Sequence, residues 1–136
     1  MMNIETRIRD SFARQTMMQT LGAEIESVAE GRVVITSPIL PGSLQQQGAG
    51  HGGLTFSIGD SAAGYAALTV LPEGAEVMTV EMKINMMSPA IGERLVAEGR
   101  VIRGGRRIVV VAADVFAEKD GARKHVAMLQ GTMIPV

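Results

Sequence analysis

The chain has 136 residues, of which 46% are hydrophobic but only 3% aromatic, and its formal net charge is −1. This length fits a single domain, spanning 1–136, around one aliphatic core. The near-zero charge argues against a nucleic-acid partner, and the lack of cysteine excludes a disulfide framework, a thiolate metal site and a cysteine nucleophile.

No segment has the roughly 20 consecutive apolar residues that a membrane-spanning helix needs. The N-terminus, MMNIETRIRDSF, mixes charged with apolar residues, whereas a secretory signal needs an unbroken apolar run. We therefore expect a soluble cytoplasmic protein without a membrane partner.

The first third of the chain predicts a helix followed by a hairpin. Ile4, Ile8 and Phe12 recur every four residues, which indicates an amphipathic helix that ends near Gly22. Residues 23–40 then form two extended segments, with a turn at Glu30-Gly31. Residues 42–50 show no apolar periodicity and are expected to form a loop.

The segment from about Gly52 to Val70 predicts a helix with apolar or small residues on every side, so it should be buried almost all round. Gly59 and Gly64 each cost about 1 kcal/mol relative to alanine in a helix. Close approach of a sheet is the expected compensation.

The remainder predicts four strands, at 79–87, 95–102, 107–117 and 124–134, with hairpin turns at Gly104-Gly105 and Asp120-Gly121. In the first of them, alternation places Val80, Met82, Ile84 and Met86 on one face and Glu81, Lys83 and Asn85 on the other. The fold class is α+β: an antiparallel sheet of five to six strands wraps around a long central helix, because a helix that is apolar all round needs cover on several sides.

The candidate chemistry begins at His51-Gly52-Gly53, immediately before the long helix. Free N–H groups of a first helical turn, together with the helix dipole, stabilise a developing oxyanion. The alternative is that Gly52-Gly53 only allows the chain to turn.

Asp60 is a carboxylate inside the buried helix, where a charge is costly unless it is paired or lies in a cleft. Either it is functional, or it is held by a nearby hydroxyl or by solvent. Gly52 and Asp60 are eight residues apart, about 12 Å along a helix, so they cannot meet on one carbonyl group within one chain. If both act, they come from the two chains of a two-fold dimer.

The other candidates have plain structural alternatives. His51 fits a structural role, through a ring N–H bond in its loop, better than a catalytic one, and His125 has no ligand spacing with it, so no metal site is expected. Ser57 and Ser61 lack the sequence context of a serine nucleophile.

Arg103, Arg106 and Arg107 form the densest basic group of the chain. They indicate either a solvated hairpin or a clamp for the phosphates of a nucleotide-bearing thioester, which Lys83 could assist.

The combined pattern of Gln45, Gly48, His51-Gly52-Gly53 and Asp60, with the later stretch TVEMKINMMSPAIGERLVAEGRVIRGGRR, resembles the hotdog-fold acyl-CoA thioesterases of the PaaI-like (phenylacetate-pathway) group. The resemblance covers nearly all of the chain from about Leu21. Gln45 stands where asparagine is common in that group.

The resemblance implies a role for each matching residue. The Gly52 N–H would polarise the thioester carbonyl, Asp60 of the neighbouring subunit would be nucleophile or general base, and Thr79 would hold the water or Asp60. Gln45 would orient the thioester or water, while His51 and Gly53 would shape the substrate site. No cofactor or metal is implied, and the assembly would be a homodimer that can pair again into a homotetramer, acting on acyl-CoA.

Two further functions remain open on the sequence. A binding module of the same fold would hold acyl-CoA without turnover, and the replacement of asparagine by Gln45 favours it. A hydratase or dehydratase of this fold would need a different acid–histidine arrangement around the central helix. The acyl group is undetermined, since Met78, Met82, Met86 and Met87 could line an adaptable pocket or simply fill the core.

Overall fold

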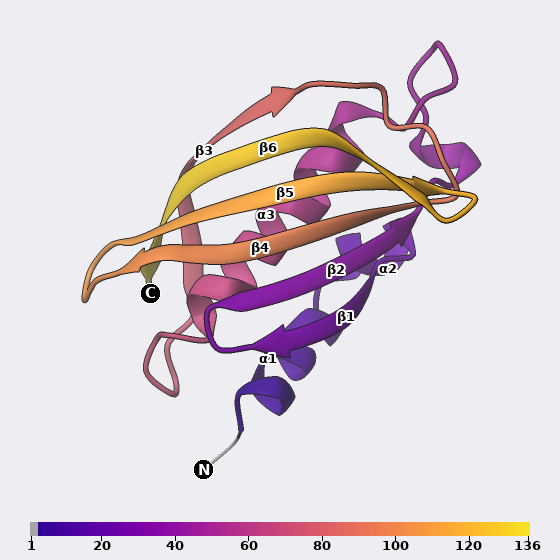
Figure 1. The fold of residues 1–136 in the computed structure, drawn as a ribbon. Helices are drawn as coiled ribbons and strands as arrows, with labels where there is room; N and C mark the ends of the chain where they lie inside the picture. The colour runs from indigo at the N-terminus through magenta and orange to yellow at the C-terminus, as the bar shows by residue number, and fades with distance from the viewer. Residues whose placement is uncertain (1–2) are drawn as a thin grey trace.

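The computed structural model of the protein describes residues 3–136 and consists of a six-stranded sheet curved around one long helix, α3 (Figure 1). All strand pairs are antiparallel, in the order β1-β2-β4-β5-β6-β3. The strands are β1 (Glu24–Ala29), β2 (Arg32–Pro38), β3 (Val77–Met86), β4 (Arg94–Gly104), β5 (Val109–Lys119) and β6 (Ala122–Pro135). The helical elements are α1 (Ile4–Ala13), α2 (Thr16–Leu21), the short 3-10 turn η1 (Pro41–Ser43) and α3 (Gly52–Leu68). The expected α+β class, with six strands around a central helix, is confirmed.

The N-terminal segment differs from the single helix expected up to Gly22. It forms two helices, which break at Arg14 and Gln15, where Gln15 adopts an extended conformation. Gln15 then donates a hydrogen bond from its side-chain amide to the hydroxyl of Tyr65 on α3, 2.8 Å away. The predicted end of the helical segment is correct, because Gly22 closes α2 in the left-handed conformation that glycine favours.

The sheet covers most of helix α3, but Phe56, Ser57, Asp60 and Ser61 form a stripe that is only partly buried, so the expected burial on all sides holds only in part. Among the fully buried residues of the helix are Ile58, Ala62, Ala63, Ala66 and Ala67. The closest approach comes from Gly99 on β4, since a Cβ there would lie 2.2 Å from the backbone of Ala62.

The two helix glycines differ in what surrounds them. A Cβ at Gly59 would lie 2.9 Å from the methyl groups of Leu129, so the expected close packing is confirmed at this position. A Cβ at Gly64 would only make an ordinary contact, 3.6 Å from the methyl carbon of Met133. Close packing therefore does not require a glycine at position 64, where a Cβ would fit in ordinary contact with the Met133 side chain.

Strand β3 carries a β-bulge that changes which side chains face the helix. Thr79 pairs with Met133 and Glu81 with Thr132, so Val80 is an extra residue on β3. Val80 is 57% exposed, whereas regular alternation would turn it inward with Met82. The expected alternation, with Val80 on the face of Met82 and Ile84, is therefore wrong at Val80, because the bulge turns Thr79 toward α3 in its place.

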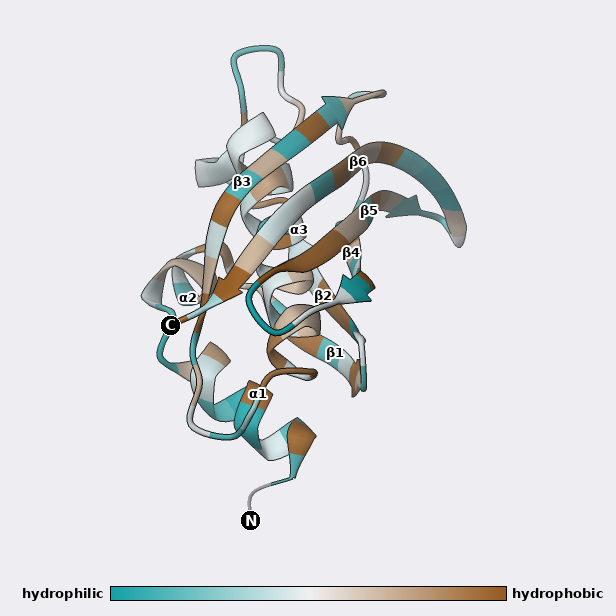
Figure 2. Ribbon diagram, turned by 90° about the vertical axis from the view of Figure 1, so that its left-hand side faces the viewer, coloured by the Kyte–Doolittle hydropathy of each residue, from teal (hydrophilic) through white to brown (hydrophobic). Residues whose placement is uncertain are grey.

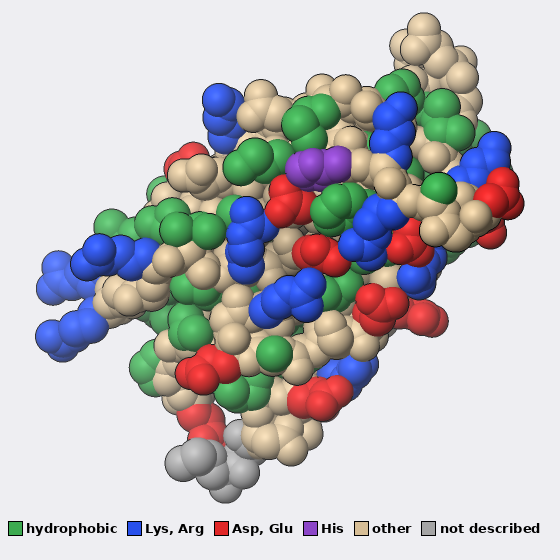
Figure 3. Space-filling view, viewed as in Figure 1, with side chains coloured by type: hydrophobic (Ala, Val, Ile, Leu, Met, Phe, Trp, Pro, Cys, Tyr) green, Lys and Arg blue, Asp and Glu red, His purple; other side chains and the backbone are tan. Residues whose placement is uncertain are grey.

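The outer face of the sheet is a mixture of acidic and basic side chains (Figure 3). Arg123 pairs with Glu98 and Glu118 at 3.0 and 3.1 Å, and these exposed pairs contribute little to stability. His125 stacks on Phe116 on this face. Within residues 3–136, no helix is long and apolar enough to cross a membrane.

Candidate active site

The N-terminus of α3 presents one backbone donor that the protein itself does not use. His51 caps the helix, and its ring Nδ1 accepts a hydrogen bond from the N–H of Gly53 at 2.7 Å. The N–H of Gly52 has no hydrogen-bond partner within residues 3–136. Gly52 therefore keeps a free donor at the positive end of the helix dipole, where an oxyanion is stabilised.

The loop before the helix is held from both sides. The N–H of Gly50 donates to the carbonyl of Ala90 and that of His51 to the carbonyl of Ser43, each at 2.8 Å. His51 holds its loop, as its sequence position indicated. The ring was expected to donate a hydrogen bond, but its Nδ1 accepts one. In this geometry the ring proton lies on Nε2, and the imidazole holds the turn in which Gly52 lies.

Gln45 is folded back on its own loop. Its side-chain oxygen accepts hydrogen bonds from the N–H groups of Gln47 and Ala49. The oxygen is thus engaged in closing the loop, while the side-chain NH2 makes no hydrogen bond within the described residues. Gln45 can offer donors to a ligand in this conformation.

Asp60 lies on α3, about two helical turns beyond Gly52, and it accepts a hydrogen bond from Thr79. The hydroxyl of Thr79 donates to Oδ1 of Asp60 at 2.8 Å, a contact that the β3 bulge makes possible. Burial raises the pKa of Asp60 above its usual value, and the hydrogen bond from Thr79 opposes this shift. A partly buried carboxylate with a raised pKa is suited to accept a proton near neutral pH.

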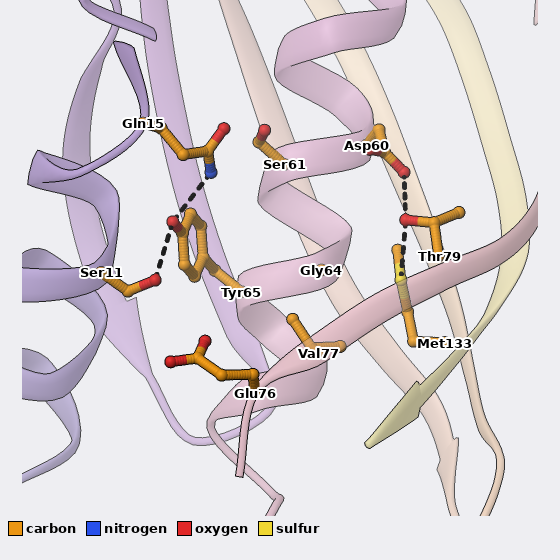
Figure 4. A pocket seen from close by; sticks show the side chains of 10 residues that line it. All are labelled: Ser11, Gln15, Asp60, Ser61, Gly64, Tyr65, Glu76, Val77, Thr79 and Met133. Atoms are coloured by element: carbon orange, nitrogen blue, oxygen red, sulfur yellow. Dashed lines mark hydrogen bonds between the residues drawn. The ribbon is translucent and has the colours of Figure 1, made fainter. Parts of the chain in front are cut away.

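Asp60 and Thr79 line a cleft of about 270 Å³ between α3, β3 and the N-terminal helices (Figure 4). Gly64, Val77 and Met133 form an apolar part of its wall. The remaining lining residues are polar: Ser11, Gln15, Ser61, Tyr65 and Glu76.

The contribution of the N-terminal helices to this cleft was missed from the sequence. Tyr65 is the only tyrosine of the chain, and its hydroxyl is bound by Gln15 and Ser11, at 2.8 and 3.1 Å. The available signal was that a single tyrosine within an apolar helix needs a polar partner for its hydroxyl.

Gly52 and Gln45 line a different cavity, of about 350 Å³, with Met86, Met87 and Pro89 among its walls. This cavity shares no lining residue with the cleft of Asp60. Along α3 the two half-sites are separated by about 12 Å. One chain therefore carries a donor half-site at Gly52 and an acid half-site at Asp60, but does not bring them together.

The predicted basic residues lie outside both half-sites. Lys83 is exposed on the outward face of β3, opposite Met82 and Ile84. The three arginines of the β4–β5 hairpin are exposed, and none forms an ion pair with a described residue; they are Arg103, Arg106 and Arg107. This hairpin projects from one end of the sheet (Figures 1 and 3).

The second histidine belongs to the outer face. Its Nε2 lies 3.0 Å from Asp114, on the side of the sheet away from α3. Across residues 3–136, no three histidine or carboxylate side chains come close enough together to hold a metal ion.

The raised pKa of Asp60 has a testable consequence for stability. Between the ordinary carboxyl pKa of 3.8 and the raised native value, the native state binds more protons than the unfolded state, so stability falls as the pH rises through that interval. Ionised Asp60 is therefore destabilising at neutral pH. We expect Asp60→Asn to raise the Tm at neutral pH and to lose this gain below pH 3.8, as measured by thermal unfolding across that range. A lower Tm at neutral pH would contradict the proposed cost of burial.

A free donor at a helix N-terminus and a half-buried carboxylate are groups of the kind that assist attack on a carbonyl group. The chain matches the Thioesterase superfamily over residues 47–124, more than half of its length, and belongs to this family. It is a thioester hydrolase with the hotdog fold, and the predicted PaaI-like resemblance is confirmed.

Several proteins of known structure or name are similar to it. A thioesterase family protein from Silicibacter pomeroyi is 39% identical, with a TM-score of 0.96 over 98% of both chains. The Escherichia coli PaaI protein from the phenylacetic acid degradation operon shares the fold, at 22% identity and a TM-score of 0.87 over 98% of this chain and 93% of that one. Human acyl-coenzyme A thioesterase 13 is 30% identical over 96 residues, which cover 70% of this chain and 68% of the human protein.

Proposed function

We propose that the protein hydrolyses acyl-CoA thioesters at two equivalent sites, each built from Gly52 of one subunit and Asp60 of the other. The observation that carries this proposal is that Gly52 and Asp60, the two groups that the reaction requires, line separate cavities of one chain. The similarity to acyl-coenzyme A thioesterase 13 supports acyl-CoA as the substrate class.

The edge of the sheet supports a dimer. β3 pairs only with β6, so its other edge is unpaired, and Met78 and Val80 on it are 55% and 57% exposed. β3 lies in front in Figure 2, where hydrophobic and hydrophilic residues alternate along it. Unpaired, apolar strand edges are rarely left open in a soluble protein, because they associate. Two β3 strands that meet about a two-fold axis would bring the α3 helices together in opposite directions.

In such a dimer each group has a defined task. The N–H of Gly52 donates to the thioester carbonyl oxygen and stabilises the negative charge that develops on it. Asp60 of the other subunit, oriented by Thr79, takes a proton from a water molecule whose oxygen attacks the carbonyl carbon. The tetrahedral intermediate then releases CoA, and the proton on Asp60 passes to the departing sulfur.

The two ends of the substrate have different surroundings. The cleft beside Asp60, whose wall includes Gly64, Val77 and Met133, suits the acyl group. The three hairpin arginines form no ion pair with any residue from 3 to 136 and suit the CoA phosphates. Their hairpin lies at the same end of the sheet as Thr79, since Val109 pairs with Met133 and Met133 with Thr79.

The activity is tested by thiol release from a panel of aryl and straight-chain acyl-CoA esters. We expect turnover of at least one ester, and the best substrate identifies the acyl group that the cleft accepts. Tight binding of an ester without turnover over hours would instead support a binding module, for which the engaged oxygen of Gln45 is the favouring observation.

The shared site is tested by mixing two inactive variants, Asp60→Asn and Gly52→Pro. Each mixed dimer would carry one site with both groups intact. After random subunit exchange, half of the dimers are mixed, so about a quarter of wild-type activity should return. Absence of any recovery, with exchange verified by a tag on one variant, would contradict a site that both subunits build.

A further inference from the structure

Thr79 has one hydroxyl proton but two acceptors within hydrogen-bond reach. Its Oγ1 lies 2.8 Å from Oδ1 of Asp60 and 3.2 Å from Sδ of Met133 (Figure 4). Met133 is fully buried, on β6 directly opposite Thr79. A hydroxyl donates only one hydrogen bond at a time, so the triplet has two alternative arrangements.

The oxygen of Asp60 that carries a proton selects between these arrangements, because a proton on Oδ2 leaves Oδ1 free to accept from Thr79, whereas a proton on Oδ1 does not. When the carboxyl is ionised, it is the stronger acceptor, and Thr79 donates to it. When Oδ1 carries a proton, Asp60 becomes the donor and Thr79 the acceptor, so the proton of Thr79 must turn elsewhere. The sulfur of Met133 is the only other acceptor within reach of this hydroxyl in the described residues.

We propose that Met133 is a positioning residue for catalysis, whose thioether accepts the hydroxyl proton of Thr79 while Oδ1 of Asp60 holds the proton taken from the hydrolytic water. This inference rests on the proposed function. Water loses a proton to Asp60 as its oxygen bonds to the carbonyl carbon. The C–S bond then breaks, the proton moves from Asp60 to the CoA sulfur, and Thr79 turns back to the ionised carboxylate.

Among the described residues, no other titratable group that lines the cleft accepts the hydroxyl proton of Thr79. Tyr65 on α3 and Glu76, immediately before β3, are the other titratable groups that line the cleft. Tyr65 is bonded to Gln15 and Ser11, and Glu76 pairs with Arg14 at 3.5 Å, so neither binds Thr79 or Asp60. The strands β4 and β5 contribute no lining residue to the cleft.

A purely packing role can be separated from this one, because leucine has nearly the volume of methionine but no sulfur acceptor. Met133→Leu should lower kcat about three- to tenfold, the usual effect of one lost hydrogen bond, with little change in KM. It should also move the acidic limb of the kcat/KM profile to lower pH, because protonated Asp60 loses support. Met18→Leu is the matched control, since Met18 is equally buried but lies on α2, and it should leave both quantities unchanged.

A double-mutant cycle with Thr79→Val completes the test. Without the hydroxyl, Met133→Leu should have no further effect on kcat or on the pH profile. The inference is overturned if Met133→Leu behaves as Met18→Leu does, or if its effect persists beside Thr79→Val. Met133→Ile, a second apolar residue, replaces Met133→Leu if that variant unfolds at the assay temperature.

Failure of this inference is distinct from failure of the proposed function. If Asp60→Asn is inactive while Met133→Leu matches the wild type, only the role of Met133 is wrong. If Asp60→Asn retains full activity, the proposed base is wrong and the role of Met133 falls with it.

Discussion

Asp60→Asn is expected to lower kcat by a factor of about 10²–10⁴, the contribution of a positioned base. Asparagine has the same shape, and its oxygen can still accept the hydrogen bond from Thr79, so the side chain should keep its position. It cannot take a proton from water. Steady-state thiol release from the best ester of the panel measures the effect.

Asp114→Asn provides the matched control for this substitution. Like Asp60, Asp114 is a carboxylate within a regular element, here β5. Its partners, however, are Arg100 and His125 on the outer face of the sheet. Its replacement should leave kcat within about twofold of the wild type, since surface pairs have small effects. Equal losses in the two variants would point to a general effect of charge and would remove Asp60 from the mechanism.

Gly52→Pro is expected to lower kcat by a factor of about 10²–10³, the cost of one lost oxyanion donor. Proline removes the backbone N–H and adds a ring, and Gly52 is the first residue of α3, where proline is well tolerated. The preceding residue, His51, already has φ −62° and ψ 144°, an extended conformation that suits a residue before proline. The helix should therefore form while the donor is lost.

The control for Gly52→Pro is Gly52→Ala, which adds a side-chain carbon but keeps the N–H. A Cβ at Gly52 would lie 3.0 Å from the methyl carbon of Met86, the flexible end of an exposed side chain that can move. Alanine should therefore retain most of the activity. If alanine and proline reduce kcat equally, space beside Met86 is what matters, and the Gly52 N–H is not the oxyanion donor.

The fold was largely predictable because its strongest signals are local. The apolar character of α3 requires cover on several sides, and the turn at Asp120-Gly121 defines antiparallel neighbours without knowledge of the structure. The expected two-residue turn at Gly104-Gly105 was wrong, because Gly104 pairs with Val109 and residues 105–108 make the connection, Arg107 included. The break at Gln15 was not predictable, because the amphipathic period of Ile4, Ile8 and Phe12 says nothing about a partner for Tyr65, fifty residues later in the chain.

The candidate site was predictable in its groups but not in its geometry. The sequence alone, through helix rise, already separated Gly52 from Asp60, and the structure places them in different cavities. The contact of Thr79 with Asp60 was expected from the family resemblance, whereas strand alternation would have turned Thr79 outward. Met133 carries no signal in sequence, since a buried methionine in a strand looks like any core residue.

The bulge at Val80 divides β3 into two segments that can vary independently. On one side of it, Thr79 is held in register with the carboxylate; on the other, Met82 and Ile84 follow their own alternation toward the core. Substitutions beyond the bulge can therefore reshape the strand without turning the hydroxyl away from Asp60. One inserted residue thus separates the contact between Thr79 and Asp60 from the packing of the rest of the strand's inner face.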